Sequence, residues 1–285
     1  KARGLDVSVI AARPGATILP GGGWYLGIKK LARFGLAAPR IGEALDFVEA
    51  GLRELALTDG PFALPDTDGV LRLVDLAPAN HAAFDAFPSS FAVAHLAPLG
   101  HPFAHMFAQM SGPASGGHGT VVEVDYPKWP GAFDRSFAAA AARLEQPAEL
   151  EALAAALKGA CAGHEAVLLP PVLGLAGSTE RRAALEARTG LKVAEALGLL
   201  PSTPGLRLEA ALRRWLEAAQ VPIHRSRVTR VQLEQGRIRT TGEGHDADAV
   251  VLATGDFIPG GLLGHGGLRE PLTGARVAPE LPIDL

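Results

Sequence analysis

Two segments have the residue types needed to bind the oxygens of a phosphate or a polyol through backbone N–H groups. One lies within residues 17–24, and the other follows an apolar run at residues 249–252. Small residues, glycine above all, let the backbone approach a ligand closely. The candidate contacts are Thr17, Gly21, Gly22, Gly23, Ala253, Thr254 and Gly255. The alternatives are a loop with nothing bound and a small-residue strand end that occurs by chance.

Three histidines, His95, His101 and His105, lie close together in the sequence. The last two are spaced i and i+4, which on a helix could hold a metal ion. No glutamate stands beside them, no third ligand is identified and Pro102 disturbs the helix, so we expect no metal. A proton-transfer role remains for His101 or His105, because imidazole titrates near neutral pH. Ordinary packed or solvated histidines are the alternative.

Two arginines could bind an oxyanion through the planar fork of the guanidinium group. Arg269 lies in the segment LREP, where the alternative is a surface salt bridge with Glu270. Arg207 lies just inside a predicted helix that follows Ser-Thr-Pro-Gly, and its alternative is an exposed helix residue.

Strands and helices alternate along much of the chain and must position these residues. Apolar runs predict strands at residues 7–11, 120–124, 166–169 and 249–255. Apolar spacing and composition predict helices at residues 41–57, 133–144, 148–161 and 202–219. A Glu-Gln-Gly connection predicts a hairpin of residues 227–233 and 237–241. Short pieces rich in Pro, Phe and His predict an irregular subdomain at residues 60–119.

Composition argues against several classes of protein. The chain has 27 Lys and Arg against 30 Asp and Glu, so its net charge of −3 gives no reason to expect binding to nucleic acid or to an anionic membrane. A single cysteine, Cys161, excludes an internal disulfide framework and a cysteine-rich metal site on this chain alone. No apolar run reaches the roughly 18 residues of a spanning helix. We expect a cytoplasmic protein.

The last third of the chain carries a recognisable order of segments. A helix is followed by VPIH, RVTRV, GRI and DAVVLATGDF. This order resembles the FAD-domain core of two-dinucleotide-binding flavoproteins of the succinate dehydrogenase and fumarate reductase type. More narrowly, residues 166–177 (AVLLPPVLGLAG), 201–223 and 253–274 (ATGDFIPGGLLGHGGLREPLTG) resemble the smaller flavoprotein subunit of anaerobic glycerol-3-phosphate dehydrogenase. Weaker similarity extends to residues 66–78 and 121–146.

The resemblance implies an α/β fold, with a Rossmann-like FAD/NAD(P)-binding core and an inserted α+β cap region. Residues 1–60 and 201–285 would form the two parts of the core, and residues 61–200 the cap or substrate region. The family begins with a strand and a Gly-x-Gly-x-x-Gly turn that binds phosphate. This N-terminal βα unit is missing here, so we expect a segment truncated at both ends, which would be inactive and without bound flavin by itself.

The resemblance also implies the cofactor. A ribose-binding acid is expected after the second strand, but the sequence there is Ala11-Ala12-Arg13. The missing carboxylate favours FMN over the alternative, FAD. The candidate flavin contacts are the seven small residues above together with Val228, whose strand contacts adenine in related flavoproteins. With FMN, that role is empty and Val228 becomes a core residue.

The implied activity is that of a quinone-linked flavin-dependent dehydrogenase, which oxidises sn-glycerol 3-phosphate to dihydroxyacetone phosphate. Arg269 would lie near the flavin or the substrate phosphate, and His101 or His105 near flavin N5. The implied partners are a larger flavoprotein subunit and an iron–sulfur subunit, through which contact with the inner face of a membrane would be indirect. Two alternatives stay open: another FAD-dependent dehydrogenase of the succinate or 3-ketosteroid type, and a non-catalytic subunit for electron relay or assembly.

Overall fold

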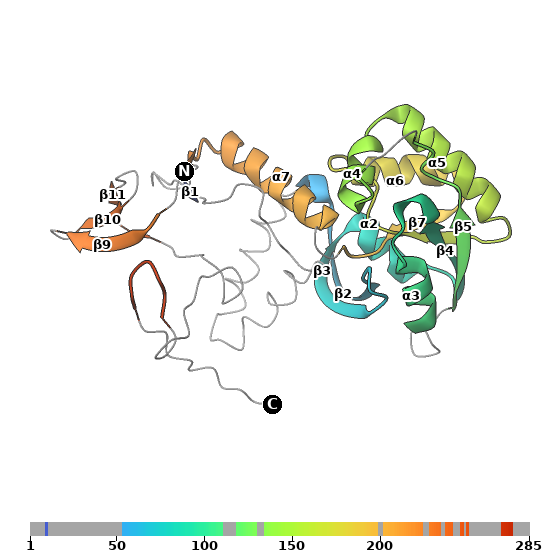
Figure 1. Ribbon diagram of the computed structural model, residues 1–285, viewed down its shortest axis with the longest axis horizontal. Helices are drawn as coiled ribbons and strands as arrows, with labels where there is room; N and C mark the ends of the chain where they lie inside the picture. Colours follow the sequence, from blue (N-terminus) through green and yellow to red (C-terminus); the bar gives the residue numbers. More distant parts are fainter. Residues whose placement is uncertain are drawn as a thin grey trace. The chain divides into compact units, whose positions relative to one another are not determined.

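The computed structural model shows an α/β protein whose chain divides into two compact units (Figure 1). Unit 1 comprises residues 1–14 and 216–285, and unit 2 comprises residues 15–215. The residues that the structure describes are 9–10, 53–110, 118–129, 134–198, 202–224, 228–234, 237–241, 246–247, 249–250 and 269–275. The predicted domain boundaries at residues 60 and 200 stay a prediction.

Unit 2 contains a four-stranded parallel sheet. Its strands are β4 (Ser90–Leu96), β5 (His118–Val124), β6 (Ala166–Leu169) and β7 (Lys192–Glu195). The order across the sheet is β5-β4-β6-β7, and all three pairings are parallel. Every residue of β6 is buried, as expected for a strand covered on both faces. The sheet lies within the range predicted to form the cap.

Helices cover both faces of this sheet (Figure 1). The helices are α3 (Phe103–Met110), α4 (Phe137–Arg143), α5 (Pro147–Ala160) and α6 (Ser178–Thr189). Phe91 and Val93 of β4 pack against Phe103 and Phe107 of α3. The alternate residues of β4 face the other side, where α5 and α6 contribute buried leucines. The sheet is therefore the middle of three layers.

Local sequence explains where α4 and α5 begin. Ser136 accepts a hydrogen bond from the Ala139 N–H at 3.1 Å, which caps α4. Pro147 occupies the first turn of α5, where its missing N–H needs no partner. The buried residues of α5 follow helical spacing: Leu150, Leu153, Ala154 and Leu157. The predicted helices at 133–144 and 148–161 are thus present, the first with a later start.

The prediction of an irregular subdomain at residues 60–119 is wrong. This range holds most of an antiparallel hairpin of β2 (Leu57–Pro65) and β3 (Leu71–Pro78), and then β4 and α3. The range also contains the short helical segments α2 (Ala79–Ala82), η5 (Ala83–Ala86) and η6 (Ala97–Leu99), and η4 (Arg53–Leu55) precedes it. The three prolines of the hairpin lie where strands tolerate them: Pro61 is in a β-bulge, and Pro65 and Pro78 are at strand ends. They therefore do not interrupt the pairing.

In unit 1, a short parallel pair joins two segments that are far apart in the sequence. Strand β1 (Val9–Ile10) pairs with β8 (Ile223–His224), which follows α7 (Thr203–Ala218). An antiparallel sheet of β9 (Arg230–Glu234), β10 (Arg237–Thr241) and β11 (Asp246–Ala247) comes next. The predicted strand at 7–11, helix at 202–219 and hairpin across residue 235 are confirmed where described. Of the last predicted strand, Ala249 and Val250 are described and are not in a strand, and residues 251–255 lie outside the described residues.

The predicted helix at 41–57 is described only at its end. Residues 53–55 form the short 3-10 helix η4 and Leu57 begins β2, so the predicted helix does not extend to residue 57. Within the described ranges, no helix is long and apolar enough to cross a membrane.

Candidate functional site

Polar side chains gather at the carboxyl ends of the strands of the parallel sheet. His95 and Glu123 are the last residues but one of β4 and β5, and Glu195 is the last residue of β7. In open parallel α/β sheets, ligands bind at this edge, next to the point where successive connections leave in opposite directions. The strand order puts that point between β4 and β6. The carboxyl edge is therefore the candidate site of unit 2.

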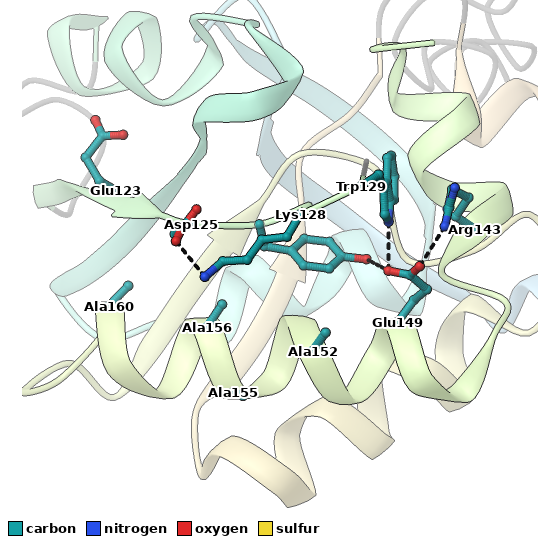
Figure 2. A pocket seen from close by; sticks show the side chains of 11 residues that line it. Glu123, Asp125, Lys128, Trp129, Arg143, Glu149, Ala152, Ala155, Ala156 and Ala160 are labelled. Carbon is teal, nitrogen blue, oxygen red and sulfur yellow. Dashed lines mark hydrogen bonds and ion pairs between the residues drawn. The ribbon is translucent and has the colours of Figure 1, made fainter. Parts of the chain in front are cut away.

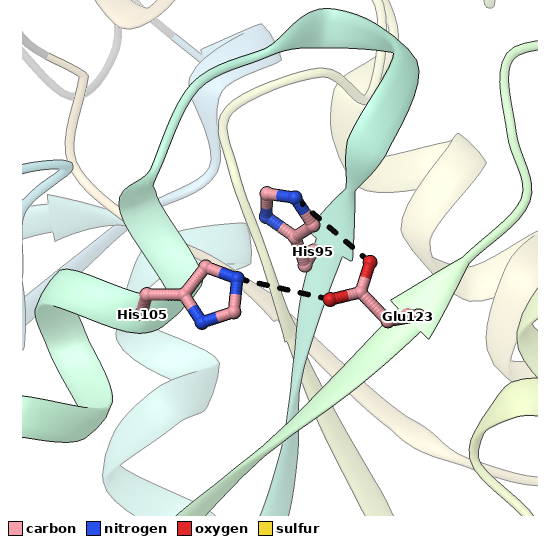
Figure 3. Close-up of side chains that lie close together, drawn as sticks. All are labelled: His95, His105 and Glu123. Atoms are coloured by element: carbon pink, nitrogen blue, oxygen red, sulfur yellow. Dashed lines mark ion pairs between the residues drawn. The ribbon is translucent and has the colours of Figure 1, made fainter.

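His95, His105 and Glu123 come together from three elements (Figure 3). In the parallel register, His95 of β4 is the direct partner of Glu123 of β5. His105 extends from α3 toward the same carboxylate. The Nε2 atoms of His95 and His105 lie 3.9 Å and 3.7 Å from Glu123 Oε2 and Oε1, and the two imidazole centroids are 4.6 Å apart. The three side chains thus point toward one common space.

His101 does not join this cluster. It precedes α3, and its Nδ1 accepts a hydrogen bond from the Phe103 N–H at 3.1 Å. Its ring also packs 4.7 Å from that of Phe137. Burial lowers the pKa of His101, with a smaller opposing effect from Asp68. The predicted i, i+4 pair of His101 and His105 is therefore not on one helix, because α3 begins between them.

A groove of about 660 Å³ lies between the segment that follows β5 and helix α5 (Figure 2). Glu149 of α5 accepts hydrogen bonds from Tyr126 Oη at 3.1 Å, Trp129 Nε1 at 2.8 Å and Arg143 at 3.0 Å. The Arg143 guanidinium also lies 4.5 Å from the centre of the Trp129 ring. Small alanines of α5, among them Ala152, leave room above the helix.

The pKa values of Glu149 and Tyr126 in the groove are both shifted. Burial raises the pKa of this carboxyl group, but its three hydrogen-bond donors and the Arg143 charge lower it below the ordinary value. Burial and the neighbouring Glu149 raise the pKa of Tyr126. The groove therefore holds Glu149 as a carboxylate and Tyr126 as a neutral phenol, and both are already engaged with each other.

A buried ion pair lies at the carboxyl end of β7, which is the edge strand on the other side of the sheet from β5. Glu195 is 0% exposed, and its two oxygens accept from Arg207 Nη1 at 2.6 Å and Nη2 at 3.0 Å. The Leu173 N–H donates at 2.6 Å and Asn80 Nδ2 also donates to Glu195. Burial raises the Glu195 pKa, but the Arg207 charge and its hydrogen bonds bring it below the ordinary value. The pair joins α2, β7, α7 and the segment after β6.

Arg207 is therefore neither a free phosphate binder nor an exposed helix residue. Its Nε donates to the Gly174 carbonyl at 2.7 Å while both terminal nitrogens bind Glu195. His81 packs on the same pair, with Nδ1 2.9 Å from the Glu195 carbonyl oxygen. Burial lowers the pKa of His81 to about 4. This network holds segments together, and each of the three guanidinium nitrogens of the buried Arg207 donates a hydrogen bond within it.

Of the predicted site residues in unit 1, the structure describes Arg269 and Val228. Arg269 is exposed, and Glu270 beside it is buried, so the alternative of an Arg269–Glu270 surface salt bridge is not formed. The Glu270 carboxylate instead accepts from the Leu272 N–H at 2.9 Å and from the N–H and hydroxyl of Thr273 at 2.7 and 2.6 Å. Val228 is half-buried and precedes β9, which begins at Arg230.

The small residues predicted to bind phosphate or polyol oxygens lie outside the described residues. They are Thr17, Gly21, Gly22, Gly23, Ala253, Thr254 and Gly255. Sequence reasoning missed Glu123 and Glu195. The available signal was a lone carboxylate at the end of each short apolar run, TVVEV and KVAE.

Comparisons with protein-family models, curated proteins and solved structures find no match to this chain. The fold defines its class as an α/β protein with a four-stranded parallel sheet.

Proposed function

We propose that the chain belongs to a flavin-dependent oxidoreductase, as a relative of the smaller flavoprotein subunit of anaerobic glycerol-3-phosphate dehydrogenase, with FMN as its cofactor. The observation that carries this proposal is the parallel pairing of β1 with β8, two short strands that are far apart in the sequence, at residues 9–10 and 223–224. In a flavin-binding core that is interrupted by a long insertion, the strands on either side of the insertion must meet again in one sheet. The β1–β8 pair supports such an arrangement.

The segments that follow agree with the same assignment. Helix α7 leads into β8, and the antiparallel sheet of β9, β10 and β11 comes next, in the order that the sequence resemblance implies. Unit 1 likewise takes residues from both ends of the chain. In the proposed arrangement, residues 1–60 and 201–285 form the Rossmann-like flavin-binding core, and residues 61–200, which contain the four-stranded parallel sheet, form the inserted cap or substrate region.

The proposed flavin contacts come from the sequence alone. Thr17 and the glycines Gly21, Gly22 and Gly23 would bind phosphate or ribitol oxygens, as would the 253–255 strand end. A bound flavin would supply hydride acceptance, and the residues of this chain would orient it and polarise the substrate. The Ala11-Ala12 sequence, without a carboxylate for an adenosine ribose, favours FMN.

Arg269 is the proposed contact for the substrate phosphate. Its side chain is exposed, and within the part of the chain that is described it forms no ion pair. An exposed guanidinium can bind a phosphate with two parallel hydrogen bonds. The proposed substrate is sn-glycerol 3-phosphate, and the proposed acceptor is a quinone, reached in the cytoplasm through a larger flavoprotein subunit and an iron–sulfur subunit at the membrane. His101 and His105 remain candidates for proton transfer, His101 through its Nε2 because Nδ1 caps α3.

The test is to identify the flavin in the protein expressed from its gene. Flavin released by denaturation is separated by chromatography, and FMN is expected in a near-equimolar amount. The variant Gly22→Val should lose flavin, whereas Gly159→Ala, an exposed glycine of α5 with open space around it, should retain it. Recovery of FAD would favour a succinate-type or 3-ketosteroid-type dehydrogenase, and absence of flavin would favour a relay or assembly subunit. Either result would contradict the proposal.

A further inference from the structure

We propose that His95, His105 and Glu123 bind a divalent transition-metal ion, with Zn²⁺ as the ion that fits them best. This site lies in unit 2, and it does not rest on the proposed flavin function. The sequence alone predicts no metal here, because the i, i+4 pair of His101 and His105 has no glutamate beside it and no identified third ligand. The parallel register of β4 and β5 supplies that ligand by placing Glu123 beside His95.

The distances are those of groups that face each other without bonding. Both His–Glu separations, 3.7 Å and 3.9 Å, are longer than a hydrogen bond. Zinc bonds to imidazole nitrogen and carboxylate oxygen are about 2.0–2.1 Å, which puts tetrahedral ligand atoms roughly 3.4 Å apart. The donor atoms, one from each residue, must therefore approach one another by up to about 1.4 Å to reach this spacing. The three donor atoms already lie within 4.8 Å of one another.

The side chains differ in how freely they can make this movement. His95 is 15% exposed and is held by the sheet, whereas His105 and Glu123 are 49% and 64% exposed. A fixed histidine and two adjustable ligands can close around an ion without moving the backbone. The backbone positions are set independently, by the β4–β5 register and by the packing of α3 on the sheet.

The donor set selects the kind of ion. Two imidazoles disfavour Mg²⁺ and Ca²⁺, which prefer oxygen ligands. Two histidines and one glutamate occur in zinc sites that leave the fourth position to water. Because His105 and Glu123 are exposed, that fourth position would be open to solvent and to an oxygen atom of a substrate. The site also lies one residue before the carboxyl ends of two strands, where ligands bind in such sheets.

The alternative is a pair of histidines that only share a carboxylate with no ion. A titration with Co²⁺, a spectroscopic substitute for Zn²⁺, distinguishes the metal site from this alternative. The protein used carries no histidine tag. The proposal predicts one equivalent of bound Co²⁺ with the intense visible absorption of a tetrahedral site. Zn²⁺ should then displace Co²⁺ and remove that absorption. Absence of Co²⁺ and Zn²⁺ binding at micromolar concentration would overturn the proposal.

Variants assign the binding to these residues. Glu123→Gln and His105→Ala change exposed side chains and should leave the fold intact, which circular dichroism can check. Loss of a direct ligand should weaken binding by more than the roughly 10–100-fold effect of outer-sphere changes. The control is His118→Ala, which removes an exposed histidine from the same strand as Glu123. Equal binding by all three variants would show an adventitious surface ion and refute the assignment. Flavin content is measured separately, so its loss or retention does not affect this result.

Discussion

Replacement of Arg207 by methionine removes one partner of the buried ion pair and should destabilise the protein severely. Arg207 is 4% exposed and Glu195 is 0% exposed, so water cannot solvate the carboxylate that remains. Removing one partner of a buried pair costs about 3–5 kcal/mol, because the other charge stays buried without compensation. The Gly174 carbonyl also loses its donor. Against a total stability of about 5–15 kcal/mol, this loss is a large fraction.

The matched control is Arg213→Met on the same helix. Arg213 pairs with Glu209 at 2.8 Å in an i, i+4 arrangement, and its side chain is 31% exposed. Pairs of this kind contribute about 0.3–0.5 kcal/mol. Urea unfolding followed by circular dichroism gives both changes in free energy. If Arg207→Met costs no more than Arg213→Met, the account of Glu195 as a buried carboxylate that depends on Arg207 is refuted.

The pH dependence of the same variant gives a second check. In the native protein the Glu195 pKa is lowered, so the pair contributes stability above the ordinary carboxyl pKa and loses it as the pH falls. Without Arg207, burial dominates and should raise the pKa of Glu195. Protonation of Glu195 at low pH should therefore remove part of the destabilisation of the variant. The destabilisation should therefore be smaller near pH 5 than at pH 8. The double variant Arg207→Met with Glu195→Gln should recover about 2 kcal/mol.

Two further predictions concern stability, and urea unfolding measures both. His81, with its pKa lowered to about 4, stays neutral in the folded protein while the unfolded chain takes up a proton near pH 6.5, so stability should fall between pH 6.5 and 4 by about 3 kcal/mol. His81→Asn should flatten this part of the profile, and an unchanged slope would contradict the assignment. Gly69→Ala should destabilise by about 1–3 kcal/mol, because φ is +82° and a Cβ would lie 2.8 Å from the Met106 backbone. Gly163→Ala, with φ of +87° and open space, should cost less, and equal costs would show that the contact with Met106 is unimportant.

Much of the secondary structure with a regular apolar pattern could be predicted. Helices α5 and α7, strand β6 and the β9–β10 hairpin lie close to their predicted positions. The errors fall where local signals and tertiary context disagree. Pro61 indicates a break in the local pattern, although it sits in a bulge of β2. Strand β7 ends in a charged residue whose burial depends on Arg207, a contact that no local pattern shows.

The sequence identifies two of the three residues of the candidate metal site. His95 and His105 are identifiable, but the i, i+4 spacing favours His101, which caps α3 instead. Glu123 is visible in the sequence as the lone carboxylate of TVVEV, but its place beside His95 follows from the parallel register of β4 and β5, which depends on the packing of the whole sheet. In each strand the polar residue is the last but one, so knowledge that the strands are neighbours would be sufficient to pair them.

The most direct test of the proposed function is identification of the flavin carried by the protein expressed from its gene. Near-equimolar FMN, reduced on addition of sn-glycerol 3-phosphate and reoxidised by a soluble quinone, is the predicted result. A protein that carries no flavin or carries FAD, or whose FMN is not reduced by sn-glycerol 3-phosphate, would contradict the proposal.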